Sequence, residues 1–231
     1  MTPKKAKIKG KIAEIFESIQ GEGIYLGKKQ IFVRFYGCNL ACEFCDTKLD
    51  KFTEYTPQEL FDKIASYPRD YHSVSFTGGE PLLQTAFLKE VLKLTKRAGM
   101  LNYLESNGAL PKELKQVINY VDIIAMDLKL PSSTHTGELW DRHRKFLKIA
   151  QRKEVFLKAV ISISTKDEDI NKSLDLIKDS KKRMALVLQP NTYEDNAAGM
   201  QTTMERFRKL CSRANVAAWI IPQRHKTLGI K

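Results

Sequence analysis

The chain has 231 residues, of which 42% are hydrophobic, and we expect a single domain over residues 1–231. No apolar run approaches the roughly 18–20 residues that a membrane-spanning helix needs, and no signal peptide is recognisable, so we expect a cytoplasmic protein without a membrane partner. The net charge of +12 raises the question of nucleic-acid binding, but the basic residues are spread along the chain without interleaved aromatics, which favours solvated helix faces.

The first part of the chain alternates strands with polar turns. Residues 1–10 form a basic extension, and strands are predicted over residues 11–17 and 30–36. Between them, the glycines flanking Glu22 indicate a tight turn in which the backbone can approach a ligand. A helix then runs to about residue 66, opened by a capping box at Thr56.

From residue 72 the chain repeats a strand–helix unit about six times. Each strand ends in polar residues, which predicts a parallel sheet with a site along the carboxyl ends of its strands. Six units are too few for a closed eight-stranded barrel, so we expect an α/β fold, a partial, open parallel (β/α)6 barrel of TIM-like type. The predicted strands are residues 72–76, 101–105, 121–126, 154–163, 184–188 and 216–220, and the predicted helices are residues 84–98, 111–119, 138–150, 167–179 and 200–213.

Three of the four cysteines, Cys38, Cys42 and Cys45, lie within eight residues in a loop directly after the strand 30–36. A closed zinc site and an ordinary iron–sulfur site each use four protein ligands. The fourth cysteine, Cys211, has no cysteine or histidine near it in the sequence. The loop 38–45 therefore predicts a [4Fe–4S] cluster that leaves one iron open to a small molecule, with zinc as the alternative.

Two further patterns point to ligands. Gly78 and Gly79 follow a buried strand, where paired glycines let backbone groups reach a ligand, although a plain strand–helix turn would look the same. Arg34 is the one charge between Val33 and Phe35 in its strand. A surface strand would carry it harmlessly, whereas a buried arginine needs an anion such as a carboxylate.

The Cys-x3-Cys-x2-Cys spacing, with Phe44 before the last cysteine, resembles the cluster loop of radical S-adenosylmethionine (SAM) enzymes. In these enzymes the open iron binds SAM, and one electron cleaves it to methionine and a 5′-deoxyadenosyl radical. Over almost the whole chain, further motifs resemble the 7-carboxy-7-deazaguanine synthase family of queuosine biosynthesis. The motifs are Glu17–Gly23, Phe32–Leu40, Cys45–Thr47, Thr77–Leu82, Glu105–Gly108, Asp127–Ser133, Gln189-Pro190 and Pro222–Lys226.

The resemblance implies a reaction and its cofactors. The family converts 6-carboxy-5,6,7,8-tetrahydropterin into 7-carboxy-7-deazaguanine with loss of ammonia, using a [4Fe–4S] cluster, SAM and Mg²⁺. The adenosyl radical removes hydrogen from C6, the ring contracts, and the hydrogen returns, so that no side chain is expected to act as a catalytic acid or base. The resemblance also implies an electron donor such as flavodoxin or ferredoxin, and a homodimer.

The resemblance further implies a role for individual residues. Cys38, Cys42 and Cys45 would hold the cluster. Thr47 would bind Mg²⁺ through its hydroxyl, because magnesium prefers oxygen ligands. The alternative role of Thr47 is to cap the next turn. The SAM site would comprise Phe44, Cys45, Asp46, Gly79, Ser106, Asp127, Leu128, Lys129, Gln189, Pro190, Asn191 and Thr192. The substrate site would comprise Ile19, Gln20, Gly21, Arg34, Thr77, His225 and Lys231.

Two other functions compete with this one. A radical SAM activating enzyme that acts on a partner protein would share the cysteines and the paired glycines, but it would not need Ile19–Gly23 and Arg34 as a small-molecule pocket. A non-enzymatic metal- or nucleic-acid-binding module would contain zinc when purified anaerobically and would bind RNA with a steep salt dependence.

Overall fold

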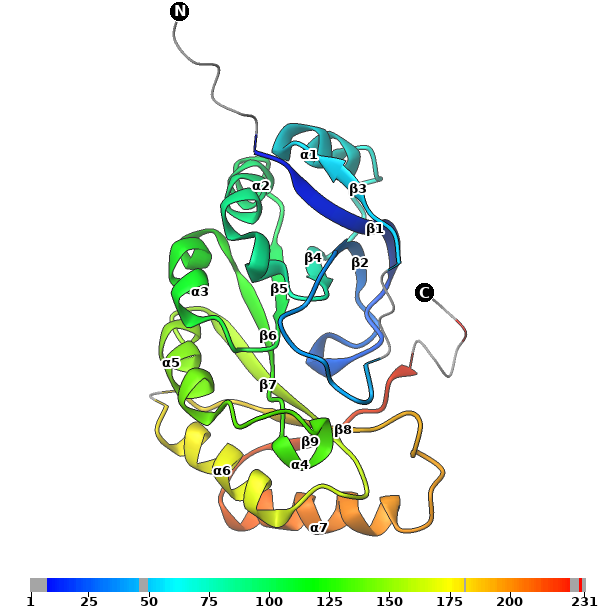
Figure 1. The fold of residues 1–231 in the computed structure, drawn as a ribbon, viewed down its shortest axis with the longest axis vertical. Helices are drawn as coiled ribbons and strands as arrows, with labels where there is room; N and C mark the ends of the chain where they lie inside the picture. Colours follow the sequence, from blue (N-terminus) through cyan, green and yellow to red (C-terminus); the bar gives the residue numbers. More distant parts are fainter. Residues whose placement is uncertain (1–7, 46–49, 181, 225–228, 230–231) are drawn as a thin grey trace, which may run out of the picture.

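The computed structural model describes residues 8–45, 50–180, 182–224 and 229. Within them the strands form one sheet in the order β3-β1-β2-β4-β5-β6-β7-β8-β9 (Figure 1). The strands are β1 (Gly10–Ile19), β2 (Lys29–Phe35), β3 (Thr53–Tyr55), β4 (Ser73–Gly78), β5 (Asn102–Ser106), β6 (Ile123–Asp127), β7 (Glu154–Ile161), β8 (Leu186–Pro190) and β9 (Ala218–Ile220). The helices are α1 (Pro57–Ala65), α2 (Thr85–Arg97), α3 (Pro111–Val117), α4 (Pro131–Thr134), α5 (Trp140–Ala150), α6 (Asp167–Lys178) and α7 (Met200–Arg213), with 3-10 turns η1 (Gly23–Tyr25), η2 (Pro81–Gln84) and η3 (Ile118–Tyr120).

Strands β2 and β4 to β9 are parallel to one another, which confirms the predicted open (β/α) barrel. The strand β1 differs, because it pairs antiparallel with both β2 and β3. Its connection to β2 contains no crossover helix, and a parallel pair needs a longer crossover than this turn supplies. The strand β3 and the helix α4 are additional to the predicted elements, and both are too short to show a clear period in the sequence.

The longer helices surround the outer face of the sheet, from α1 at the top of the view through α2, α3 and α5 on its left to α6 and α7 at the bottom (Figure 1). Each buries an apolar stripe, as in α2, where Phe87, Leu88, Val91 and Leu92 recur with helical spacing. The capping box predicted at Thr56 is present, because its side chain accepts a hydrogen bond from Glu59 N at the start of α1.

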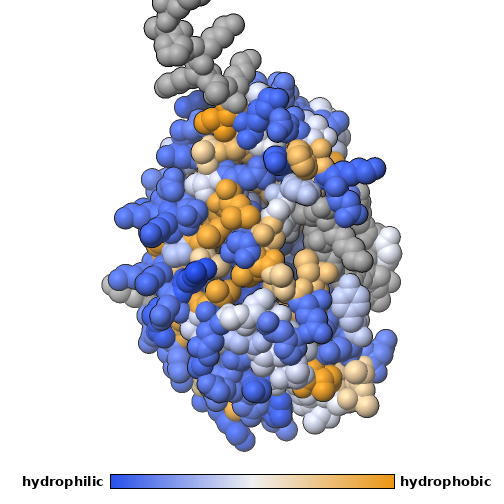
Figure 2. Space-filling model, viewed as in Figure 1, coloured by the Kyte–Doolittle hydropathy of each residue, from blue (hydrophilic) through white to orange (hydrophobic). Residues whose placement is uncertain are grey.

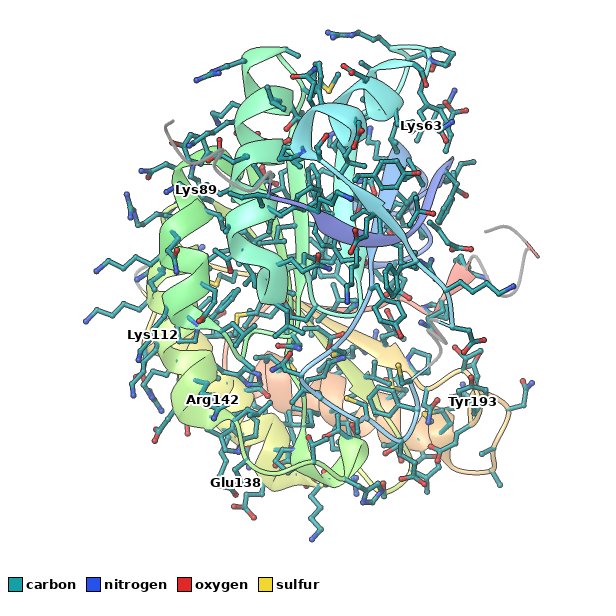
Figure 3. The ribbon with its side chains drawn as sticks, turned by 45° about the horizontal axis from the view of Figure 1, so that its top comes forward. Lys63, Lys89, Lys112, Glu138, Arg142 and Tyr193 are labelled. Carbon is teal, nitrogen blue, oxygen red and sulfur yellow. The ribbon has the colours of Figure 1, made fainter. Side chains whose placement is uncertain are left out.

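Charged side chains lie on the outward surfaces of the helices. Lys63, Lys89, Lys112 and Arg142 project from α1, α2, α3 and α5 in Figure 3. The space-filling view shows hydrophilic residues around the rim of the face seen there, with hydrophobic residues gathered near its centre (Figure 2). In the described part of the chain, no helix has the length and apolar character needed to cross a bilayer.

The inner face of the sheet is filled at the amino-terminal ends of the strands. Tyr103, Phe156 and Val187 alternate with residues that face the helices, so they point into the barrel. The turn η1 packs against them, with the Tyr25 ring 5.6 Å from that of Tyr103. Gly23 is required here, because its φ is +67° and an added Cβ would lie 2.7 Å from the Phe156 ring. Side chains thus fill this end of the barrel.

Candidate active site

A cavity of about 710 Å³ lies at the carboxyl ends of the parallel strands. Six of these strands each place at least one polar residue on its wall. These residues are Arg34 (β2), Thr77 (β4), Glu105 and Ser106 (β5), Asp127 (β6), Lys158 (β7) and Gln189 (β8). A second cavity of about 840 Å³ lies between the ends of α6 and α7, and it contains none of the motif residues.

The three clustered cysteines reach the same cavity from the loop that follows β2. This loop lies directly against the turn after β4, because Gly79 N donates to Phe35 O at 2.9 Å and Glu80 N to Gly37 O at 2.8 Å. An added Cβ at Gly79 would lie 1.9 Å from Gly37 O, so only glycine allows the two backbones to approach this closely. The paired glycines therefore position the cysteine loop over the strand ends.

The cysteines themselves are free thiols. Cys38 and Cys45 are exposed and Cys42 is partly buried, whereas Cys211 is buried inside α7. Burial raises the pKa of the Cys42 thiol, and the Lys129 ammonium acts in the opposite direction. In residues 8–45, 50–180, 182–224 and 229, no three His, Cys, Asp or Glu side chains converge as one metal ion requires. In a cluster each cysteine sulfur binds a separate iron, so the three sulfurs need not converge on one point.

Beside the cysteines, the wall carries groups suited to a charged cofactor. Lys129 Nζ lies 2.8 Å from Asp127 Oδ2 and 5.8 Å from the centre of the Phe44 ring. Burial alone would lower the pKa of Lys129, but Asp127 and Cys42 raise it above its ordinary value, so the ammonium stays charged. Asp127 Oδ1 and Gln189 Oε1 are buried without a hydrogen-bond partner among the described residues. Such unsatisfied oxygens suit the amino and hydroxyl groups of a ligand.

On the opposite wall, Arg34 presents a partly buried cation. Its side chain is 27% exposed and lies over the Phe16 ring, 5.4 Å from the ring centre. Nε lies 3.6 Å from the Glu14 carboxylate and has no hydrogen-bond partner in the described part of the chain. The guanidinium therefore retains capacity for an anion.

A carboxylate fixed by its neighbours lies on β5, two strands away from Arg34 in the sheet. Glu105 accepts hydrogen bonds from Gln20 Nε2 at 3.0 Å and from the Ser75 and Thr77 hydroxyls at 3.3 Å. Gln20 is 4% exposed and also donates to Gln30, so its orientation is set from two sides. Together these groups offer donors and acceptors to a flat polar ligand.

Residues 32–177 match the Radical SAM superfamily. A 7-carboxy-7-deazaguanine synthase from Geobacter sulfurreducens is 35% identical, over 94% of this chain and 96% of its own length. Another, from Methanothermobacter thermautotrophicus, is 32% identical over 95% of this chain and 97% of its own. The chain belongs to the 7-carboxy-7-deazaguanine synthase family.

Solved structures share its fold. The crystal structure of QueE from Escherichia coli has a TM-score of 0.64 and 19% sequence identity, over 91% of this chain and 92% of that one. The structure of anSMEcpe with bound AdoMet has a TM-score of 0.56 and 16% identity, over 79% of this chain and 58% of that one. Radical SAM enzymes use a [4Fe–4S] cluster and SAM, and the cysteines, Lys129 and the unsatisfied oxygens described above fit both groups.

Most residues that the sequence assigned to the site of this synthase family meet at the cavity. Those on its wall are Cys38, Cys42, Cys45, Phe44, Gly79, Ser106, Asp127, Lys129, Gln189, Asn191, Ile19, Gln20, Gly21, Arg34 and Thr77. Leu128, Pro190 and Thr192 are not on the wall. Leu128 packs in the core against the helices, because it alternates with Asp127. Asp46, Thr47, His225 and Lys231 lie outside the described residues.

Sequence reasoning missed a group of residues that joins distant parts of the cavity wall. Lys158 Nζ forms an ion pair with Glu22 and lies 3.8 Å from Asp127 Oδ2. Gln223 Nε2 donates to Glu22 Oε1 at 2.5 Å, and Arg224 N donates to Gly21 O at 3.0 Å. The turn after β1, strand β7 and the carboxyl-terminal segment are thereby linked. A lone lysine within the apolar run of β7 was the signal that could have identified Lys158.

Proposed function

We propose that this chain catalyses the reaction of its family, the conversion of 6-carboxy-5,6,7,8-tetrahydropterin into 7-carboxy-7-deazaguanine with loss of ammonia. The observation that carries the proposal is the joint presence, in one cavity, of the three-cysteine wall and the Arg34 cation. An enzyme that acts on a partner protein has no need of this second, polar wall for a small molecule.

Cys38, Cys42 and Cys45 are the proposed ligands of the cluster, and Asp127, Lys129, Gln189 and the backbone at Gly79 are proposed to hold SAM beside it. Cluster and SAM, when bound, supply one electron and an adenosyl radical. The side chains on the cavity wall orient SAM relative to the cluster. Lys129 carries the positive charge that a carboxylate group requires, and Asp127 offers its free oxygen to a donor.

Arg34 is the proposed partner of the pterin carboxylate. A guanidinium binds a carboxylate through two parallel hydrogen bonds, and partial burial strengthens the interaction. Glu105 is placed to accept hydrogen bonds from the amino and N–H groups on the pyrimidine edge of a pterin, because its own neighbours fix the carboxylate. Ile19, Gln20, Gly21 and Thr77 complete this wall.

The remaining assignments are proposals that follow the family motifs. Thr47 would bind Mg²⁺, Asp46, Pro190, Asn191 and Thr192 would contact SAM, and His225 and Lys231 would close over the substrate. If Thr47 is a magnesium ligand, Thr47→Ala should blunt the stimulation of turnover by Mg²⁺, while an unchanged response would contradict the assignment.

We also propose that the whole chain is one domain, that it forms a homodimer, and that flavodoxin or ferredoxin reduces it. A reducing cytoplasm suits three free thiols that must bind iron. Size-exclusion chromatography with light scattering tests the dimer. Turnover with each purified donor tests the source of electrons.

The decisive experiment is anaerobic reconstitution of the cluster, followed by incubation with reductant, Mg²⁺, SAM and the carboxypterin. Mass analysis should find 7-carboxy-7-deazaguanine, with release of ammonia and without net loss of SAM. A protein that holds four irons and cleaves SAM but leaves the carboxypterin unchanged would support an activating enzyme instead. A colourless, zinc-containing protein would exclude both radical functions.

A further inference from the structure

Asn107, directly after β5, contacts the cysteine loop through its side-chain amide. Its side-chain Nδ2 donates to Asn39 Oδ1 at 2.9 Å and lies 3.9 Å from Cys38 Sγ, within reach of an N–H···S interaction. The residue is 6% exposed, so water does not compete freely for this amide. Asn107 was not among the residues that the sequence assigned to the site.

The other polar groups of Asn107 are all held by buried neighbours. Its backbone N–H donates to Glu80 Oε2 at 2.8 Å, and its side-chain oxygen accepts from Ala109 N at 3.0 Å. Its carbonyl oxygen lies 3.1 Å from His143 Nε2, and His143 and Glu80 are both 0% exposed. The orientation of the amide is therefore set by the fold and not by the cysteine loop alone.

His143 contributes as a neutral donor. A carbonyl oxygen can only accept, so the proton must be on Nε2, and Nδ1 is left without a partner in the described part of the chain. Burial lowers the pKa of His143 to about 4, which keeps the ring neutral near pH 7. The imidazole thus holds the Asn107 carbonyl without adding a charge beneath the cluster loop.

The Cys38 sulfur is arranged to accept hydrogen bonds. Besides the Asn107 amide, the backbone N–H of Leu40 donates to this sulfur. Hydrogen bonds to the cysteine sulfurs are one of the factors that set the potential of an iron–sulfur cluster. They stabilise the reduced cluster more than the oxidised one, because reduction adds negative charge to the cluster.

We propose that Asn107 is a positioning residue whose side-chain amide donates to the Cys38 sulfur, raises the reduction potential of the cluster, and is held in place by Glu80 and His143. The proposal rests on the assignment of Cys38 as a cluster ligand. Its consequence is a cluster that is easier to reduce by the one electron that starts the reaction.

The test is an anaerobic redox titration of the reconstituted enzyme, in which electron paramagnetic resonance measures the reduced cluster. The wild type and the variants are compared at equal iron content. Asn107→Leu removes the donor and keeps the branched shape of the side chain, and Asn107→Asp removes the donor while keeping an acceptor for Ala109 N. A hydrogen bond to a charged group is commonly worth about a factor of ten in an equilibrium constant. We therefore expect the ratio of reduced to oxidised cluster in Asn107→Leu to fall about tenfold at a fixed potential, a shift of about 59 mV for one electron.

Asn102 supplies the matched control. It is fully buried at the opposite end of the same strand, where its amide donates to the Leu92 and Tyr120 carbonyls. Asn102→Leu should lower thermal stability without moving the potential. An unchanged or raised potential in Asn107→Leu would overturn the proposal, and so would failure of both Asn107 variants to assemble a cluster.

One further variant separates this inference from the function on which it rests. If Cys38→Ala still assembles a complete cluster, the ligand assignment fails and the Asn107 effect loses its basis. If Cys38→Ala loses the cluster while Asn107→Leu keeps the wild-type potential, the proposed function stands and the role of Asn107 is refuted.

Discussion

Lys158 offers the most direct test of how the cavity is held together. Its side chain is 10% exposed and pairs with Glu22, whose side chain is 15% exposed, while Asp127 lies 3.8 Å away. The pKa of Lys158 is raised well above its ordinary value, because Glu22 and Asp127 outweigh the effect of burial. Lys158→Met keeps the length of the side chain but removes the Lys158 ammonium from its ion pair with Glu22.

Removing one partner of a buried ion pair costs about 3–5 kcal/mol of stability. We expect the lower end, about 3 kcal/mol, because Gln223 still donates to Glu22 and Lys129 still neutralises Asp127. For a chain of this length that loss corresponds to a fall of roughly 6–12 °C in Tm. The double variant Glu22→Gln/Lys158→Met removes both charges and should return to within about 1 kcal/mol of the wild type.

Urea unfolding of the wild type, the two single variants and the double variant gives the coupling free energy between Glu22 and Lys158. The same series at raised salt should change little, because a buried pair is weakly screened. If Lys158→Met lost less than about 1 kcal/mol, or if the double variant were no more stable than Lys158→Met, the pair would not be the link we describe.

Three further predictions concern the cavity. Arg34→Gln should weaken binding of the carboxypterin tenfold or more while leaving SAM binding within about twofold, measured by anaerobic calorimetry; equal losses would refute its role as the carboxylate partner. Cys42→Ala should fail to assemble the cluster, whereas Cys211→Ala should retain full iron and sulfide content, because Cys211 is buried in α7; the reverse outcome in either variant would contradict the ligand set. Burial raises the pKa of Glu80 from 4.5 to about 7, so its contribution to stability is complete below about pH 4.5 and is lost as the pH rises through about 7. Glu80→Gln should therefore gain stability relative to the wild type across this interval, by up to about 1.4 kcal/mol per pH unit in urea unfolding, and parallel pH profiles would show that the carboxyl is not buried as described.

The order of the strands and helices was predictable, because each element carries its own period. The helix 200–213 was predicted with the boundaries that α7 has, and the other boundaries shift by a few residues, as where β8 runs to Pro190 and not to Leu188. The antiparallel direction of β1 and the short strand β3 were missed. Neither leaves a periodic signal, and pairing direction depends on where the connecting turn returns the chain.

The candidate site was predictable where its residues are close in the sequence. Three cysteines within eight residues must lie near one another in any fold, and a glycine pair after a buried strand indicates a close backbone approach. By contrast, Glu22 and Lys158 are far apart in the chain and meet only because the sheet curves. Asn107 is a similar case, since its contact with Cys38 depends on two strand ends coming together.

The sequence by itself therefore determined the family, the cysteine loop and the set of strands whose carboxyl ends carry polar residues, because these depend on local spacing and on alternation along each strand. The tertiary structure decided which polar residues face one another across the cavity. Arg34 lies beside Thr77, and Asp127 beside Lys158, through the register of neighbouring strands. Register is set by packing between elements distant in the chain, so alternation within a single strand does not encode it.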